Sequence, residues 1–267
     1  MVYGIAKMLN FAHGDVIMVG GDVSFFATTS FNLPPLAGVL LAMLVCTVLG
    51  VTIERLAYRP LRQASALAVL ITAIGVSYFL QNAALLLWTS NPKVFPAIVG
   101  DYTFKLGDQI SVSATTLVAI ASCLVIMIGL TWFTGRTKMG KAMRACSEDK
   151  GAAQLVGINV NSTISVVFAI GSALAAVAGI LLCSAYPTLS PTTGSMPGIK
   201  AFTAAVFGGI GSIPGAFVGG ILLGVIEIFG KAYISTQLSD AIVFLVLIVV
   251  LLVRPTGLMG KVVQEKV

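Results

Sequence analysis

The sequence predicts an all-α fold, a polytopic transmembrane helical bundle with a Gly-rich broken hairpin and a short cytoplasmic helix. Hydrophobic residues make up 57% of the 267-residue chain and charged residues only 10%, and the mean hydropathy is +1.01. Soluble domains carry about 25% charged residues. The apolar runs approach the roughly 20 residues that a membrane-spanning helix needs, and they lack the alternating polarity of a membrane β-barrel. No linker divides the chain, so one domain, residues 1–267, is expected.

The apolar runs set the order of the helices. Residues 14–30 form a weaker span, since Asp15 and Asp22 interrupt it. The region 199–229 is broken by "GGIGSIPG" at 208–215, and Gly and Pro at that density end a helix. We therefore expect a short helix to about residue 208, a turn, and a helix from about residue 215. The clear spans are residues 36–53, 66–88, 112–133, 163–186 and 238–253.

Small residues recur four positions apart in two of these regions. In lipid, such faces let helix backbones approach closely. We expect this packing to occur inside the bundle, with a subunit interface as the alternative. The residues concerned are Gly171, Ala175 and Gly179, Gly215 with Gly219, and Gly220 with Gly224.

The distribution of positive charge predicts the orientation. Lys and Arg collect in cytoplasmic loops, which accounts for the net charge of +6 without nucleic acid. This rule places 54–62, 134–162 and the tail after residue 252 in the cytoplasm. The region 199–229 must then start and finish outside. Its Gly-rich tip is either part of a translocation path, where broken helices are tolerated, or a plain turn at the cytoplasmic face.

The sequence carries no motif for covalent chemistry. It has no HExxH, GxSxG or phosphate-binding GxxxxGK[ST] motif, so it is not expected to be an enzyme or to hydrolyse ATP by that route. No metal site and no cofactor are predicted, and the four cysteines have neither disulfide nor metal spacing. Acidic residues in apolar runs usually face a cavity or a partner, which leaves ion coupling open for Asp15, Asp22, Glu227 and Asp240. Glu227 could also pair with Lys231 at i+4.

A dense polar stretch, residues 136–160, interrupts the apolar sequence. Within it, "SEDKGAAQLVGI" predicts a short helix with Ser147 as N-cap and Gly157 near its end. Ala152, Leu155 and Val156 give this helix a small apolar face. That face would lie on the membrane or the bundle, or insert into a groove on a cytoplasmic partner.

Three segments resemble a known family. "GAAQLVG" (151–157) resembles the EAA–three residues–Gly signature of ABC importer permeases, with Gly151 in place of the usual Glu. "MVYGIAKMLNFAHGDVIMVGG" (1–21) and "AFTAAVFGGIGSIPGAFVGGILLGVIE" (201–227) resemble branched-chain amino acid permeases of the LivH type. Such permeases usually have another apolar helix before the "MVYG" segment.

The resemblance implies a transmembrane permease subunit of a binding-protein-dependent ABC importer for leucine, isoleucine and valine, in a prokaryotic plasma membrane. It implies two cytoplasmic ATPase subunits, a second related permease subunit and an extracytoplasmic amino-acid-binding protein as partners, besides membrane lipid. A permease of the same family for urea or short amides is an alternative, as is a stand-alone secondary transporter. The resemblance assigns ATPase coupling to Glu148, Asp149, Ala152, Ala153 and Gly157.

The translocation path is a separate hypothesis. A zwitterionic amino acid loses hydration in an apolar path, which costs many kcal/mol. Half-helix ends and free backbone groups near "NFAHG" and "GGIGSIPG" could offset part of this cost. The candidate path residues are Asn10, His13, Gly208, Gly209, Gly211 and Pro214.

Overall fold

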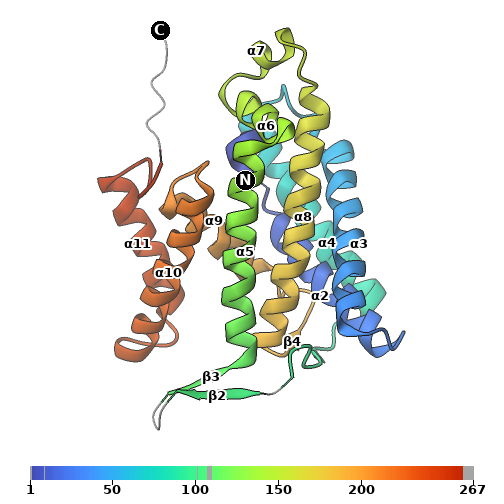
Figure 1. The fold of residues 1–267 in the computed structure, drawn as a ribbon, viewed down its shortest axis with the longest axis vertical. Helices are drawn as coiled ribbons and strands as arrows, with labels where there is room; N and C mark the ends of the chain where they lie inside the picture. The colour runs from blue at the N-terminus through green and yellow to red at the C-terminus, as the bar shows by residue number, and fades with distance from the viewer. Residues whose placement is uncertain (1, 9, 101, 107–109, 261–267) are drawn as a thin grey trace.

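The computed structural model describes residues 2–8, 10–100, 102–106 and 110–260, and it is a helical bundle (Figure 1). Five helical stretches in these residues are long and apolar enough to cross a membrane. They are α3 Pro35–Ile53 with its π-helical continuation η1 Glu54–Tyr58, α4 Ala66–Trp88, α5 Ala114–Arg136, α8 Val160–Ala185 and α10 Ile213–Tyr233. The predicted all-α membrane bundle is therefore confirmed. Of the charges used for orientation, Asp101, Asp108, Lys261 and Lys266 lie outside the described residues.

Helix α2, His13–Thr29, lies at the centre of the bundle and is buried along most of its length by α3 and α8. Its two acids, which weakened the predicted span, are 1% (Asp15) and 3% (Asp22) exposed. They are covered by protein, so a carboxylate here does not meet lipid. The described residues before α2 include the short helix α1, Val2–Ala6.

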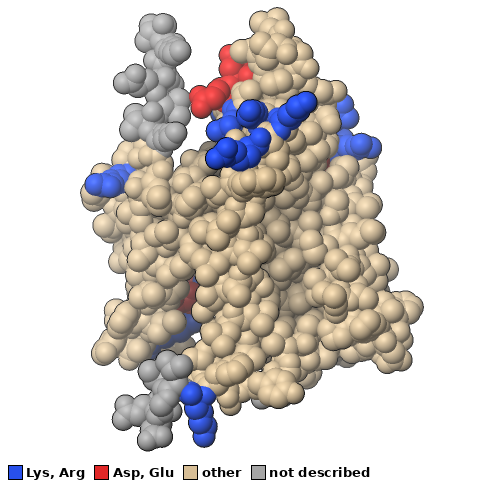
Figure 2. Space-filling view, viewed as in Figure 1, with Lys and Arg blue, Asp and Glu red and all other residues tan. Residues whose placement is uncertain are grey.

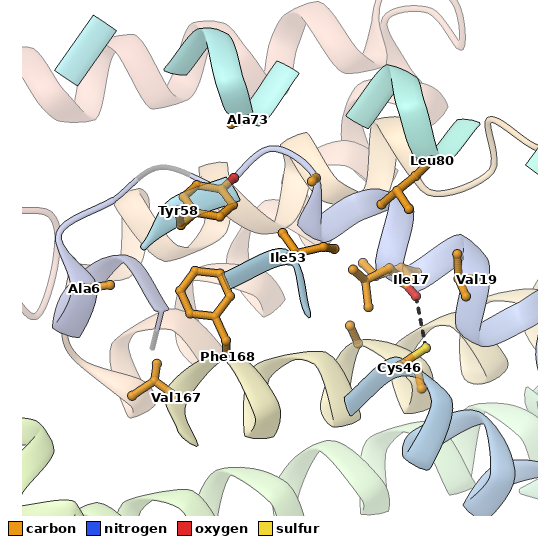
Figure 3. Packing of buried hydrophobic residues seen from close by; sticks show 14 of the residues in the cluster. Ala6, Ile17, Val19, Cys46, Ile53, Tyr58, Ala73, Leu80, Val167 and Phe168 are labelled. Carbon is orange, nitrogen blue, oxygen red and sulfur yellow. Dashed lines mark hydrogen bonds between the residues drawn. The ribbon is translucent and has the colours of Figure 1, made fainter. Parts of the chain in front are cut away.

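The small residues of α8 allow α2 to approach closely, as predicted. A Cβ atom on Gly179 would overlap the carbonyl oxygen of Ile17, and one on Gly20 would overlap the backbone of Ala176. Nearby, the rings of Tyr58 and Phe168 pack at a centroid distance of 5.4 Å, and the Cys46 thiol donates to the carbonyl of Val16 at 3.6 Å (Figure 3). Close backbone packing thus replaces large side chains along the α2–α8 contact.

Helices α9 Ser195–Gly208, α10 and α11 Ser239–Val253 form a second group beside the main bundle (Figure 1). They have a separate small core built on Phe207, Leu223 and Val243. Gly215 and Gly219 pack against the backbone of α9, as predicted, whereas a Cβ on Gly224 would meet open space. Gly220 faces Ala204 at ordinary contact distance, so neither glycine of the Gly220–Gly224 pair is required for close backbone packing among the described residues.

The Gly-rich break lies between α9 and α10, as expected, with the turn at 209–212. Backbone hydrogen bonds join its start to the segment after α11: Leu258 N donates to Phe207 O at 3.0 Å, and Met259 N donates to Gly208 O at 2.9 Å. Helix α10 begins at Ile213 rather than near residue 215, because Pro214 in the first turn loses no helical hydrogen bond. The tip thus lies beside the segment that follows α11, whose tail is predicted to be cytoplasmic.

The two ends of the molecule differ in structure and charge. Helices α6 Lys138–Glu148 and α7 Lys150–Leu155 stand at the end predicted to be cytoplasmic, called the cytoplasmic end below, where most of the basic side chains visible on this face gather (Figures 1 and 2). At the other end the connections form short antiparallel strands. β1 Lys93–Val94 pairs with β4 Thr188–Leu189, and β2 Thr103–Leu106 pairs with β3 Ile110–Ser113. The loops predicted to lie outside therefore carry these strands.

Candidate coupling and transport site

The cytoplasmic helices begin with a tight turn at the end of α5. Thr137 is extended, and its hydroxyl accepts a hydrogen bond from Gly140 N at 2.9 Å, which caps α6. A Cβ on Gly140 would overlap the carbonyl of Phe133. A glycine therefore lets α6 turn back sharply against the end of α5.

The N-cap of α7 is Asp149, so the prediction of Ser147 is wrong. The Asp149 carboxylate accepts from Gly151 N at 2.7 Å and from Ala152 N at 3.1 Å. Ser147 lies inside α6, and its hydroxyl donates to the carbonyl of Arg144 at 2.7 Å. The reason is that the helix started by Thr137 runs to Glu148, and the chain becomes extended only at Asp149, where a cap can act.

Helix α7 presents an uncovered apolar surface. Leu155 is 91% exposed, Val156 is 74% exposed, and Ala152 is exposed beside them, whereas Ala153 is buried against the bundle. The helix ends at Leu155, and Gly157, two residues later, has a φ of +83°, in the left-handed region. Gly157 N donates to Gln154 O and Ile158 N to Ala153 O, both at 3.0 Å, which is the Schellman arrangement of a helix end.

Two lysines tie the junction of α6 and α7 to the N-terminal segment. Lys150 Nζ donates to Ala6 O at 2.8 Å, and Lys7 Nζ approaches Glu148 O at 3.5 Å. Burial lowers the pKa of Lys150, and the positive charges of Arg62 and Lys7 lower it further. The sequence offered no signal for these contacts, because the partners are more than 140 residues apart.

A buried carboxylate anchors the cytoplasmic end of α3. Glu54 is fully buried, forms an ion pair with Arg62, and accepts from the Ser165 hydroxyl of α8 at 2.7 Å. Arg62 also donates to Asn161. This cluster joins the loop after α3 to the start of α8, directly beside α7. The sequence showed that this loop is basic, but it did not show that Glu54 is buried.

The candidate path residues fall into two separate sets. Asn10 accepts a hydrogen bond from the buried Tyr58 hydroxyl at 2.8 Å, and His13 is half-buried at the first turn of α2. Gly208, Gly209, Gly211 and Pro214 lie together in the turn between α9 and α10. No hydrogen bond joins the two sets among the described residues, although α1 approaches the turn where Gly4 meets Gly211.

The glycines of the turn have different local roles. A Cβ on Gly208 would overlap the carbonyl of Gly215, and one on Gly209, with φ +112°, would overlap Gly260. Gly211 has φ +90°, but a Cβ there would meet nothing within 4 Å. Gly208 and Gly209 are therefore needed for close packing, whereas Gly211 is needed only for its backbone conformation.

A polar cluster within the bundle joins three helices. Gln81 of α4 donates to the Asp15 carboxylate of α2 at 2.9 Å and contacts the hydroxyls of Ser195 of α9 at 3.2 Å and Ser77 at 3.3 Å. Sequence reasoning singled out Asp15 but missed Gln81 and Ser195. Because buried polar groups are almost always hydrogen-bonded, a polar residue in another apolar span, such as Gln81, was a candidate partner for Asp15.

The other three acids of the apolar runs are ion-paired. Asp22 lies 3.8 Å from Lys93. Lys200 of α9 lies 3.0 Å from Glu227 and 2.7 Å from Asp240, which links α9, α10 and α11. Glu227 also pairs with Lys231 at 2.6 Å, as the i+4 spacing predicted. Each of these charges thus has a basic partner within the chain.

The described residues hold no group of three or more His, Cys, Asp or Glu side chains that could bind a metal ion.

The family model of the branched-chain amino acid transport system permease component matches residues 1–251. The chain belongs to this permease family. It is accordingly a multi-pass membrane protein of the transport class.

Curated relatives resemble the chain over its whole length. The high-affinity branched-chain amino acid transport system permease protein BraD of Pseudomonas aeruginosa is 46% identical, covering 100% of this chain and 91% of BraD. LivH of Escherichia coli strain K12, a permease of the same description, is 44% identical, covering 100% of this chain and 90% of LivH. A probable LivH of Methanocaldococcus jannaschii is 28% identical over 97% of this chain and 85% of its own length. No solved structure matches the chain.

Proposed function

We propose that this chain is the membrane-spanning permease subunit of a binding-protein-dependent ABC importer for leucine, isoleucine and valine. In this assembly it pairs with a second related permease, two cytoplasmic ATPase subunits drive the cycle, and an extracytoplasmic binding protein delivers the amino acid. The similarity to BraD and LivH supports this substrate class. The chain itself performs no covalent chemistry on the substrate.

The exposed apolar end of α7 is the observation that carries the proposal. Leu155 and Val156 stand at the cytoplasmic end, covered by none of the described residues, on a helix that Asp149 caps at its start and Gly157 at its end. Such a surface is unfavourable in water and favours a groove on a cytoplasmic protein. The contacts of Lys150 with Ala6 and of Lys7 with Glu148 would pass a displacement of α7 to the N-terminal segment before α2.

The paired acids argue against the alternative of a stand-alone secondary transporter. Coupling to an ion requires a carboxylate that gains and loses a cation during transport. Asp22, Glu227 and Asp240 already have lysine partners, and Asp15 is hydrogen-bonded to the neutral Gln81. An external motor is therefore the simpler source of energy.

The test is ATP hydrolysis by the complete complex reconstituted in lipid vesicles with its binding protein. We expect leucine, isoleucine and valine to stimulate hydrolysis and to accumulate inside, and urea and acetamide to do neither. Stimulation by urea or acetamide alone would transfer the proposal to the amide class. Uphill uptake by this permease without the ATPases would refute the proposal as a whole.

A further inference from the structure

An open groove of about 410 Å³ lies at the cytoplasmic end between the α3–η1 segment and the start of α8. Its upper wall is polar, with Arg55 of η1 and Arg59, the residue after η1, facing Asn161 and Ser162 from the first turn of α8. None of these four residues belongs to the coupling helix or to the candidate path. The groove is therefore a feature that the proposed transport function does not use.

The two arginines of the groove have no side-chain hydrogen bond or ion pair with the residues that the structure describes. Arg62, the third arginine of the same loop, is held by Glu54 and Asn161. Arg55 and Arg59 are exposed, and in the described part of the chain neither forms an ion pair. A guanidinium stays charged at all ordinary pH values, and its planar fork matches the oxygens of a phosphate. The upper wall is thus suited to a phosphate group.

The lower part of the groove is apolar and lies within the membrane spans. It is lined by Val51 of α3 and by Val166 and Ala169 of α8, and the hydroxyl of Ser165, the polar residue at this depth, is taken up by Glu54. At 1.5 Å per residue, Val51 lies roughly 6 Å deeper than Arg55, and Val166 roughly 9 Å beyond the start of α8. Below it, Leu44 and Val48 continue the exposed apolar surface of α3, at 62% and 59% exposure. Positive charge at the membrane surface therefore stands directly above an apolar surface that runs into the bilayer.

We propose that this groove binds an anionic phospholipid of the cytoplasmic leaflet, with its phosphate between Arg55 and Arg59 and its acyl chain along Val51 and Val166. The positive charge above an apolar surface is complementary to the negative headgroup and apolar chains of such a lipid. A cytosolic protein reaches the arginines but not the part of the groove inside the span. Basic pockets on the cytoplasmic side of membrane helices have the chemistry that anionic lipid headgroups require. The proposal does not depend on which solute the permease carries.

A tryptophan reporter placed below the groove tests this binding. The chain has two tryptophans, so Trp88→Phe and Trp132→Phe remove the native signal and Val48→Trp supplies a single reporter on the lipid-exposed face of α3. The whole chain is reconstituted in bilayers that contain either brominated phosphatidylglycerol or brominated phosphatidylcholine. Bromine quenches tryptophan on contact, so the ratio of the two quenching curves gives the preference for the anionic lipid.

We expect a preference for phosphatidylglycerol that falls about fivefold in Arg59→Gln, the factor for one basic residue at the surface of an anionic membrane. Arg55→Gln is the second variant and should lower it similarly. Arg136→Gln is the matched control, because it removes an equal charge from an exposed arginine at the cytoplasmic end of α5. Equal quenching by the two lipids would overturn the proposal, as would an equal fall in the control. Absence of quenching by either lipid would also overturn it, because protein would then cover the groove.

Discussion

Leu155 provides the sharpest test of the coupling surface. Its side chain is 91% exposed on α7, so it contributes little to the fold of the permease but is available to a partner. Leu155→Ala removes three carbon atoms, each worth about 0.8 kcal/mol when buried. If an ATPase groove takes up this side chain, the loss is about 2 kcal/mol, which corresponds to about 30-fold weaker binding.

The assay is the affinity of the purified ATPase subunits for the permease pair held in nanodiscs. Leu56→Ala is the matched control, because Leu56 is 75% exposed in η1 at the same end of the molecule. We expect Leu155→Ala to weaken binding by the stated factor, to leave the thermal stability of the permease within about 0.5 kcal/mol, and to reduce uptake. Unchanged affinity in Leu155→Ala, or an equal loss in Leu56→Ala, would refute the assignment of α7 as the docking element.

Three further predictions concern the supports of these sites. Asp149→Ala removes the carboxylate that accepts the first free N–H groups of α7; we expect α7 to lose about 1 kcal/mol of stability, seen as faster amide exchange in 150–156, with Asp149→Asn retaining protection. Glu54→Leu leaves Arg62 without its buried partner and should cost about 3–5 kcal/mol; a melting temperature in detergent equal to that of the parent would contradict a structural ion pair. Gly211→Ala should keep the bundle assembled at a cost of about 1–2 kcal/mol for its positive φ. Gly208→Ala should lower the yield of folded protein because its Cβ has no room. If Gly211→Ala assembles and transports at the parent rate, Gly211 is not part of the path.

Most of the membrane-spanning helices were predictable from the sequence because they depend on local properties, although α11, Ser239–Val253, is shorter than the five helices long enough to cross a membrane. The orientation stays a prediction from the distribution of positive charge. The length of an apolar run decides whether a helix can cross the bilayer, and the run 66–88 has the bounds of α4. Positive charge beside a span decides its side of the membrane. The break at 208–215 was also visible, since Gly and Pro act on the backbone where they stand.

The partners of the polar residues were decided only by the tertiary structure. Asp15 and Asp22 weakened the predicted span as isolated charges, yet α2 is central because α4 supplies Gln81 and the outer loop supplies Lys93. Ser147 was the expected cap, but the extent of α6 gave that role to Asp149. A hydrogen bond or an ion pair joins residues that the fold brings together, and the cost of burying each group depends on that partner. The sequence by itself therefore determined where the chain crosses the membrane, and the packing of the helices decided what each buried polar group does there.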